Sequence, residues 1–115
     1  MKVIIAGGRT FSDYDLLCQK CDMALSLQTE IEIVSGGANG ADKLGEKYAN
    51  EKGYPIKQFP ADWDKYGKSA GYRRNEEMAK YADALIAFWD GKSKGTNHMI
   101  DLAKHYGLNV VVIIF

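Results

Sequence analysis

Apolar and polar positions follow two alternating patterns along the chain. Five short runs are mostly apolar, and between them lie four longer segments whose apolar positions recur every three to four residues. The first pattern predicts strands and the second predicts amphipathic helices. The predicted strands are Lys2–Ala6, Ile31–Val34, Pro55–Phe59, Asp83–Trp89 and Asn109–Phe115, and the predicted helices are Ser12–Gln28, Ala41–Gly53, Tyr72–Ala82 and Thr96–Gly107.

The ends and buried faces of two of these helices are also predicted. Ser12 and Asp15 have the spacing of a capping box at the start of the first helix. The apolar stripe of that helix is predicted to hold Leu17, Cys21, Ala24 and Leu25. The corresponding stripe of the last helix is predicted to hold Met99, Leu102, Ala103 and Tyr106.

The second, fourth and fifth predicted strands are nearly uninterrupted apolar runs. Such runs are typical of strands covered on both faces of a parallel sheet. Strands that alternate with helices predict right-handed crossovers and a doubly wound, Rossmann-like α/β fold. We therefore expect one domain, residues 1–115, with five parallel strands in the order 3-2-1-4-5 and about four helices. The ligand crevice is expected between strands one and four, where the strand order reverses.

Three loops rich in small residues follow strands one, two and four, and all are expected at this edge of the sheet. They are Gly7–Thr10, Ser35–Asp42 and Trp89–Thr96. Glycine-rich backbone that leads into a helix presents N–H groups and the positive end of the helix dipole, which suits a phosphate group. None of the loops is a Gly-x-Gly-x-x-Gly or Walker motif, and each taken alone also fits a tight turn with a helix cap. Together they favour a phosphorylated ligand.

The candidate ligand-binding residues come from these loops and from two neighbouring segments. They are Gly7, Gly8, Arg9, Thr10, Ser35, Gly36, Gly37, Ala38, Asn39, Gly40, Asp42, Trp63, Arg74, Asn75, Trp89, Asp90, Gly91, Ser93, Lys94, Gly95 and Thr96. Trp63 either stacks on a base or covers the sheet edge. Arg74 either reaches a phosphate or pairs on the surface with Glu76 or Glu77. His98 and His105 are expected on a solvated stripe of the last helix.

Composition narrows the class of partner. Of the 115 residues, Lys and Arg together number 15 and Asp and Glu number 15, so the net charge is zero. A neutral chain gives no global attraction to nucleic acid. The apolar run at the N-terminus is too short for a signal peptide or a membrane span, so we expect a cytoplasmic protein without a membrane partner.

The sequence holds two cysteines, Cys18 and Cys21, with two residues between them. This spacing permits a redox pair or half of a metal site, but both lie inside a predicted helix rather than at its N-terminus. We expect one in the core and one near the surface. No metal site is evident, and Mg²⁺ would arrive only with the phosphates of a ligand.

Five stretches resemble the YspA-type members of the SLOG superfamily, which also includes the LOG cytokinin-activating enzymes and the DNA-processing protein DprA/Smf. They are "IIAGGRTF", "SGGANGAD", "FPADWDKYGKSAGYRRNEEM", "ADALIAFWDGKSKGT" and "HMIDLA". The resemblance covers nearly the whole chain. It implies a Rossmann-like fold with a site for nucleotides or nucleotide-derived ligands at the glycine loop and at Gly95–Thr96.

The LOG enzymes hydrolyse the base–ribose bond of nucleoside monophosphates and carry glutamates just after the Gly-Thr pair. Those positions read Asn97, His98 and Met99 here, whereas Arg74 is the counterpart of the LOG arginine. The resemblance thus implies that the phosphate-binding half is kept and the acid–base half is lost. Hydrolysis would need a substitute carboxylate. Asp42 is one candidate, beside Arg74.

The function expected first is that of a sensor or binding module for a nucleotide or a nucleotide-derived molecule similar to ADP-ribose. The alternative is an N-glycosidase or phosphoribohydrolase of the LOG type. A second alternative is DprA-like binding of single-stranded nucleic acid, against which the zero net charge argues. We also expect a homodimer or higher homo-oligomer. The apolar segment Asn109–Phe115 would otherwise form an uncovered outer strand, and the LOG relatives are commonly dimeric.

Overall fold

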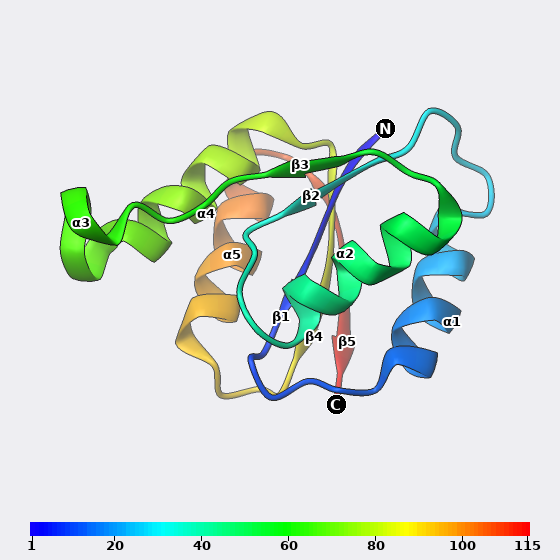
Figure 1. The fold of residues 1–115 in the computed structure, drawn as a ribbon, viewed down its shortest axis with the longest axis horizontal. Helices are drawn as coiled ribbons and strands as arrows, with labels where there is room; N and C mark the ends of the chain where they lie inside the picture. The colour runs from blue at the N-terminus through cyan, green and yellow to red at the C-terminus, as the bar shows by residue number, and fades with distance from the viewer.

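A five-stranded parallel sheet runs through the middle of the computed structural model, which describes residues 1–115 (Figure 1). The strands stand in the order β3-β2-β1-β4-β5, as the sequence predicts. They are β1 (Lys2–Gly7), β2 (Glu32–Ser35), β3 (Ile56–Gln58), β4 (Ala84–Trp89) and β5 (Asn109–Ile114). The order reverses between β1 and β4, so the carboxyl ends of these two strands form the switch point of the sheet.

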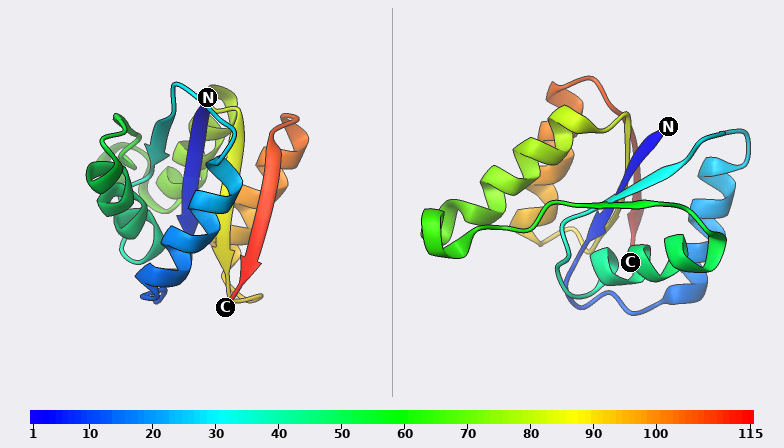
Figure 2. Two further views of the ribbon diagram at one scale, coloured as in Figure 1. Left: turned by 90° about the vertical axis from the view of Figure 1, so that its right-hand side faces the viewer. Right: turned by 45° about the horizontal axis from the view of Figure 1, so that its top comes forward.

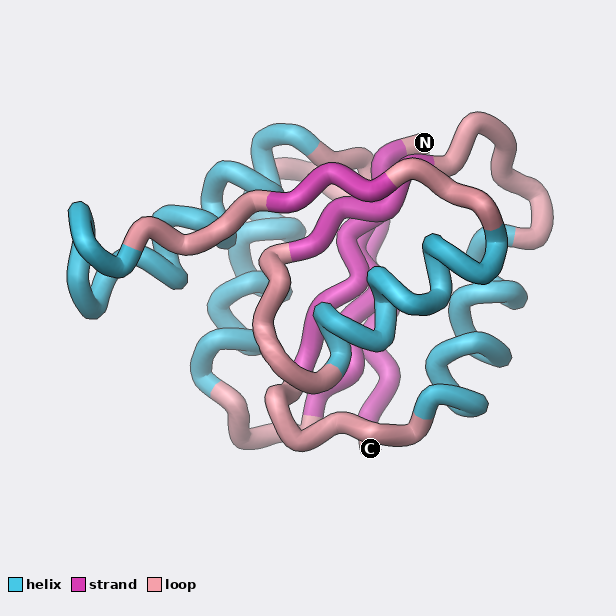
Figure 3. The backbone as a smooth tube through the Cα atoms, in the orientation of Figure 1, coloured by secondary structure: helices cyan, strands magenta, loops and turns pink.

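Two pairs of helices cover the two faces of the sheet (Figure 2). One face carries α1 (Tyr14–Leu25) and α2 (Ala41–Lys52), and the other carries α4 (Ala70–Tyr81) and α5 (Lys94–His105). A short helix, α3 (Trp63–Tyr66), and a 3₁₀ turn, η1 (Gly67–Ser69), extend beyond β3. Figure 3 shows that α3 lies at one end of the molecule, away from the sheet.

The sheet divides the core in two because successive side chains of a strand point to opposite faces. Val3 and Ile5 of β1 join a cluster with the α1 and α2 side chains. Ile4 joins a second cluster with Met78 of α4 and Met99 of α5. All five of these side chains are at most 1% exposed, so the doubly wound architecture predicted from the apolar runs is confirmed.

Strand β5 differs from its prediction. The apolar run suggested cover on both faces, but Val111 is 44% exposed and Ile114 is 62% exposed. The reason is its place at the edge of the sheet, where it pairs with β4 alone and lies beyond the helices that cover β1 and β4. The prediction of two covered faces holds for β4, whose first five residues are buried.

Three local expectations are also corrected. The N-cap of α1 is Asp13, whose carboxylate accepts from the Leu16 N–H at 3.0 Å, and not Ser12. Tyr106 is 38% exposed because α5 has already ended at His105. The helix predicted for Tyr72–Ala82 begins two residues earlier, at Ala70, and α3 precedes it, capped by Asp62, which accepts from the Lys65 N–H at 3.0 Å.

The two cysteines lie on α1 as expected, with Cys21 buried and Cys18 half-buried. Burial, followed by the nearby Cys18 and Asp22, raises the pKa of the Cys21 thiol to about 12. A thiol with so high a pKa stays protonated and unreactive at neutral pH, which fits a packing role. No helix of the structure combines the length and the apolar character needed to cross a bilayer.

Candidate functional site

Loops from three strands meet at the carboxyl edge of the sheet, next to the switch point. The loop after β1 is tied to both neighbours: the Gly8 N–H donates to the Phe88 carbonyl at 3.0 Å. The Gly8 carbonyl in turn accepts from the Ala41 N–H at 3.3 Å, at the start of α2. These backbone bonds fix the loop after β1 to the end of β4 and to the start of α2, beside a crevice.

The crevice consists of three adjoining cavities that share Arg9 and Arg74. The glycine-loop lobe has a volume of about 450 Å³ and is lined by Arg9, Gly36, Gly37, Ala38, Asn39, Lys43, Gln58, Pro60, Ala61, Trp63 and Arg74. The central hollow, of about 100 Å³, is lined by Ala6, Gly7, Arg9, Ala38, Asp42, Arg74, Asn75, Met78, Ser93, Gly95, Thr96 and Met99. The α5 lobe, of about 460 Å³, is lined by Gly8, Arg9, Thr10, Trp63, Lys68, Gly71, Tyr72, Arg74, Asn75, Asp90, Ser93 and Gly95.

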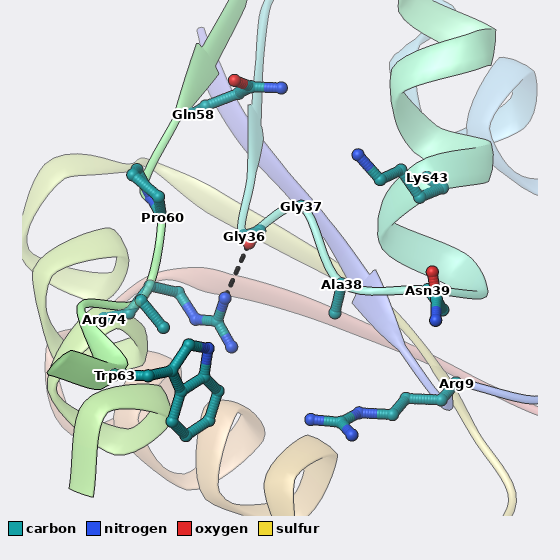
Figure 4. Close-up of a pocket in the computed structure, with 11 residues that line it drawn as sticks. Arg9, Gly36, Gly37, Ala38, Asn39, Lys43, Gln58, Pro60, Trp63 and Arg74 are labelled. Atoms are coloured by element: carbon teal, nitrogen blue, oxygen red, sulfur yellow. Dashed lines mark hydrogen bonds between the residues drawn. The ribbon is translucent and has the colours of Figure 1, made fainter. Parts of the chain in front are cut away.

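Arg74 lies at the centre of this arrangement. Its Nη1 donates to the Gly36 carbonyl at 2.7 Å (Figure 4). Its Nε donates to the Asn75 Oδ1 at 3.2 Å. A Cβ atom on Gly36 would lie 2.6 Å from Nη1, so a glycine is required for the guanidinium to fit here. The two contacts leave donors of the guanidinium free toward the cavities, because an arginine carries five N–H groups.

Arg9 is the other shared cation, and it has no partner in the protein. Its guanidinium makes neither an ion pair nor a hydrogen bond, and it extends from the loop after β1 toward Trp63 across the glycine-loop lobe (Figure 4). Trp63 is 52% exposed, so much of its indole is open to a ligand. An unpaired cation that faces an exposed indole suits a ligand with a negative charge and a planar ring.

Asp42, in the first turn of α2, is the buried carboxylate of the crevice and is only 5% exposed. Its Oδ2 accepts from the Ala38 N–H at 3.4 Å, a long hydrogen bond. Burial raises the pKa of Asp42 to about 6, against the opposing effects of the Arg74 charge and of the Ala38 and Gly7 backbone, and Glu46 adds a smaller increase. Asp42 therefore changes its charge near neutral pH, inside the crevice.

This raised pKa predicts a pH-dependent stability. The carboxyl of Asp42 is protonated more readily in the folded chain than in the unfolded chain, so its contribution is complete below about pH 4. The contribution is then lost as the pH rises through about 6, and at the stated pKa its size is about 2–3 kcal/mol. Urea unfolding of the wild type and of Asp42→Asn between pH 4 and 8 measures it. The wild type should lose stability relative to the variant as the pH rises, and parallel curves would contradict the assignment.

The loop after β2 uses two of its own N–H groups internally. The Gly37 N–H donates to the Ser35 hydroxyl at 3.1 Å, and that hydroxyl donates to the Glu46 Oε2 at 2.7 Å. The Ala38 N–H is directed to Asp42. Ser35 is fully buried, so its hydroxyl holds the loop in shape and does not face the crevice. The groups that face the cavity here are therefore the remaining backbone groups of the loop and the nearby side chains of Arg9, Lys43 and Arg74.

The start of α5 forms the opposite wall. Ser93 is the N-cap and accepts from the Thr96 N–H at 3.4 Å, while Asp90 accepts from the Lys92 and Ser93 N–H groups at 2.8 Å each. Asn75 reaches this wall from α4, with Nδ2 3.4 Å from the Gly95 carbonyl. The side-chain oxygens of Ser93 and Asp90, which were expected to contact a ligand, therefore accept hydrogen bonds from the turn itself.

His98 departs from the expectation of a solvated stripe, while His105 is exposed as expected. His98 is half-buried, with Nδ1 3.3 Å from the Asn75 Nδ2 and its ring 4.5 Å from the Tyr72 ring. Burial lowers the pKa of His98, against smaller opposing effects of Asp101 and Glu76. His98 contacts Asn75 through this pair of nitrogen atoms and lines none of the three cavities.

Arg73 and Arg74 are neighbours in sequence but have different surroundings. Arg73 stacks on the Tyr66 ring at 4.4 Å, and its Nε donates to the Ser69 hydroxyl at 3.2 Å. The surface ion pair on this helix joins Lys80 to Glu76 at 3.3 Å. Surface pairing with Glu76 or Glu77 therefore does not account for Arg74, which lies over Gly36 instead.

Most of the candidate residues line the crevice, but five do not: Ser35, Gly40, Trp89, Gly91 and Lys94. Other lining residues were not among the candidates. Lys43, Lys68 and Tyr72 are the most notable. Lys68 lies in η1 and Tyr72 in the first turn of α4, and their chemistry was visible in the sequence although their direction was not. The two lysines add positive charge to that of Arg9 and Arg74, against the acidic Asp42 and Asp90.

Sequence and structure comparisons identify proteins that this chain resembles. The sequence model of the YspA, cpYpsA-related SLOG family matches residues 1–66. The Gene 61 protein of Mycobacterium phage D29 is 32% identical over 120 residues, which cover 96% of this chain and 94% of that protein.

Two solved structures share the fold. TM1055, a structural genomics target, has a TM-score of 0.69 at 20% identity, over 95% of this chain and 71% of its own. The DNA processing protein A of Helicobacter pylori, described for its single-stranded DNA binding mode, has a TM-score of 0.64 at 22% identity, over 97% of this chain and 64% of its own. The family match, the phage relative and the shared fold agree, and the chain belongs to the YspA, cpYpsA-related SLOG family.

Proposed function

We propose that this protein binds a nucleotide or a nucleotide-derived molecule similar to ADP-ribose at the crevice, as a sensor or binding module. The observation that carries the proposal is the unpaired Arg9 guanidinium, which faces the exposed indole of Trp63 beside Arg74. Two guanidinium groups suit a phosphate or diphosphate, because their planar N–H forks match its oxygens. A base stacked on Trp63 would gain apolar contact and a favourable ring geometry.

The dimensions of the crevice support a ligand larger than a free phosphate. The two lobes, of about 450 and 460 Å³, are each in the range of small-molecule sites, and both contain Arg9 and Arg74. A ligand with a phosphate group beside the two arginines would extend a nucleoside into one lobe and a second group into the other. A nucleotide sugar or a dinucleotide has this shape.

A thermal-shift panel tests the proposal. The panel contains nucleoside mono-, di- and triphosphates, NAD, ADP-ribose, cyclic nucleotides and a short DNA single strand, each with and without Mg²⁺. A ligand at 100 times its Kd stabilises by about 2.7 kcal/mol, which raises the Tm of a small domain by roughly 10 °C. A shift with one nucleotide class is the expected result, and no shift with any member would contradict it. A response to the single strand alone, weakened by salt, would favour nucleic-acid binding instead.

A second candidate function rests on Asp42. A carboxyl with a pKa of about 6 beside Arg74 is suited to exchange a proton near neutral pH, as N-glycosidic cleavage of a nucleotide requires. Incubation of the purified protein with each ligand of the panel, followed by chromatography, distinguishes the two functions. Release of free base that is lost in Asp42→Asn would establish a hydrolase. Recovery of the intact ligand would support a binding module.

A further inference from the structure

Strand β5 is an edge strand without the usual protection. Natural proteins protect such edges with charged side chains, prolines or bulges. From Val110 to Phe115 this strand has none of these residues and no bulge interrupts its register with β4. Val111, Val112, Ile114 and Phe115 are 44%, 37%, 62% and 41% exposed. Both faces of the strand are therefore apolar, and both reach solvent.

The free backbone groups of β5 follow from its pairing with β4. The Asn109 N–H donates to the Asp83 carbonyl at 3.2 Å, and the Phe115 N–H donates to the Trp89 carbonyl at 3.1 Å. Successive residues of a strand direct their N–H and C=O groups to opposite edges, so the odd-numbered residues bond to β4. Val110, Val112 and Ile114 therefore direct both backbone groups outward, away from the sheet.

We propose that β5 pairs in antiparallel fashion with β5 of a second copy of this chain, about a two-fold axis at Val112, and joins the two sheets into one. In this register Val112 lies opposite the second Val112, and Val110 lies opposite Ile114. Each of the three outward-facing residues then exchanges its N–H and C=O bonds with an outward-facing residue of the other copy. A shift by one residue would place outward groups opposite inward ones.

The side chains match in the same register. Residues directly opposite each other in an antiparallel pair lie on the same face and contact each other. On one face Val112 meets Val112 and Val110 meets Ile114, and on the other face Val111 meets Ile113. Every one of these cross-strand pairs is apolar, and none of them brings like charges together.

A second copy is a better occupant of this edge than a strand of another protein, because the outward set is complementary to itself under two-fold symmetry. The chain has 15 basic and 15 acidic residues, so no net repulsion opposes the approach of two copies. The edge strand itself carries no charged side chain that would select a charged partner.

Two variants of the edge test the proposal. Val112→Pro removes an N–H group that points away from β4, so the sheet keeps its own bonds while the central contact of the pair is lost. Ile114→Lys places a charge at an exposed side chain, opposite an apolar residue of the other copy. Leu27→Lys is the matched control, because Leu27 is 91% exposed and lies outside the strand.

Sedimentation velocity and light scattering at micromolar concentrations provide the readout. The wild type and Leu27→Lys should have twice the chain mass of 12.8 kDa, and the two edge variants should be monomers with an unchanged circular dichroism spectrum. Amide exchange measured by NMR should show protection of Val110, Val112 and Ile114 that disappears in Ile114→Lys. A monomeric wild type would overturn the proposal, and so would a dimer that survives Val112→Pro and Ile114→Lys.

Discussion

Arg74→Ala should weaken binding of the best nucleotide of the thermal-shift panel by about 10- to 150-fold. The range corresponds to the loss of charge-assisted hydrogen bonds, of about 1.5–3 kcal/mol. Arg74 is held over Gly36 by its 2.7 Å bond and lines all three cavities, so its removal takes a cation away from the whole crevice. Isothermal titration calorimetry of the wild type and the variant measures the difference.

The matched control is Arg73→Ala. It removes the same charge from the next position of α4, but Arg73 stacks on Tyr66 and lines none of the three cavities. We expect its Kd to stay within a factor of about three of the wild type, because a distant exposed charge is screened by salt. Equal losses in the two variants would mean that the effect is general electrostatics, and the proposed role of Arg74 would be wrong.

The second large effect is expected for stability. Gly40, the N-cap of α2, has a φ of +79° and a ψ of −127°, a conformation that is essentially restricted to glycine. A Cβ atom there would lie 2.2 Å from the Gly8 carbonyl oxygen, which belongs to the rigid loop after β1. Gly40→Ala should therefore lower the free energy of unfolding by more than about 3 kcal/mol, since both backbone strain and a backbone clash must be relieved.

Gly53→Ala separates these two causes. Gly53 also has a positive φ, +76°, but a Cβ atom there would meet nothing within 4 Å. Its substitution should cost about 1–2 kcal/mol, the strain of the left-handed conformation alone. Urea unfolding curves with the same m value provide both numbers. If Gly40→Ala costs no more than Gly53→Ala, the close approach of the two loops would be refuted.

Much of the fold could be predicted from the sequence because the apolar periodicity reports directly which residues are buried. The strand order, four of the helices and the position of the three loops followed from that signal. The exposure of β5 did not follow, because an apolar run looks the same in a central strand and in an edge strand. Tyr106 has helical spacing with Met99, but the pattern does not show that α5 ends one residue before it.

The sequence predicted the location of the site more accurately than the role of each residue in it. Glycine and serine in a loop indicate possible ligand contacts, yet Ser35 and Asp90 direct their oxygens to the chain itself. Which partner a hydroxyl or carboxylate selects depends on distances of a few tenths of an ångström, which sequence spacing does not encode. The direction of Lys68 and Tyr72 depends on α3 and η1, short elements that have no periodic signal of their own.

Arg9 and Arg74 belong to every cavity of the crevice, and this limits its stoichiometry. Two small anions that prefer different lobes would still require the same pair of guanidinium groups. Fragments found separately should therefore displace one another in competition experiments, even where their apolar parts do not overlap. If the proposed binding holds, each chain should saturate with a single anionic molecule. Two fragments joined by a chemical linker should then bind well only if one of them lacks its negative group.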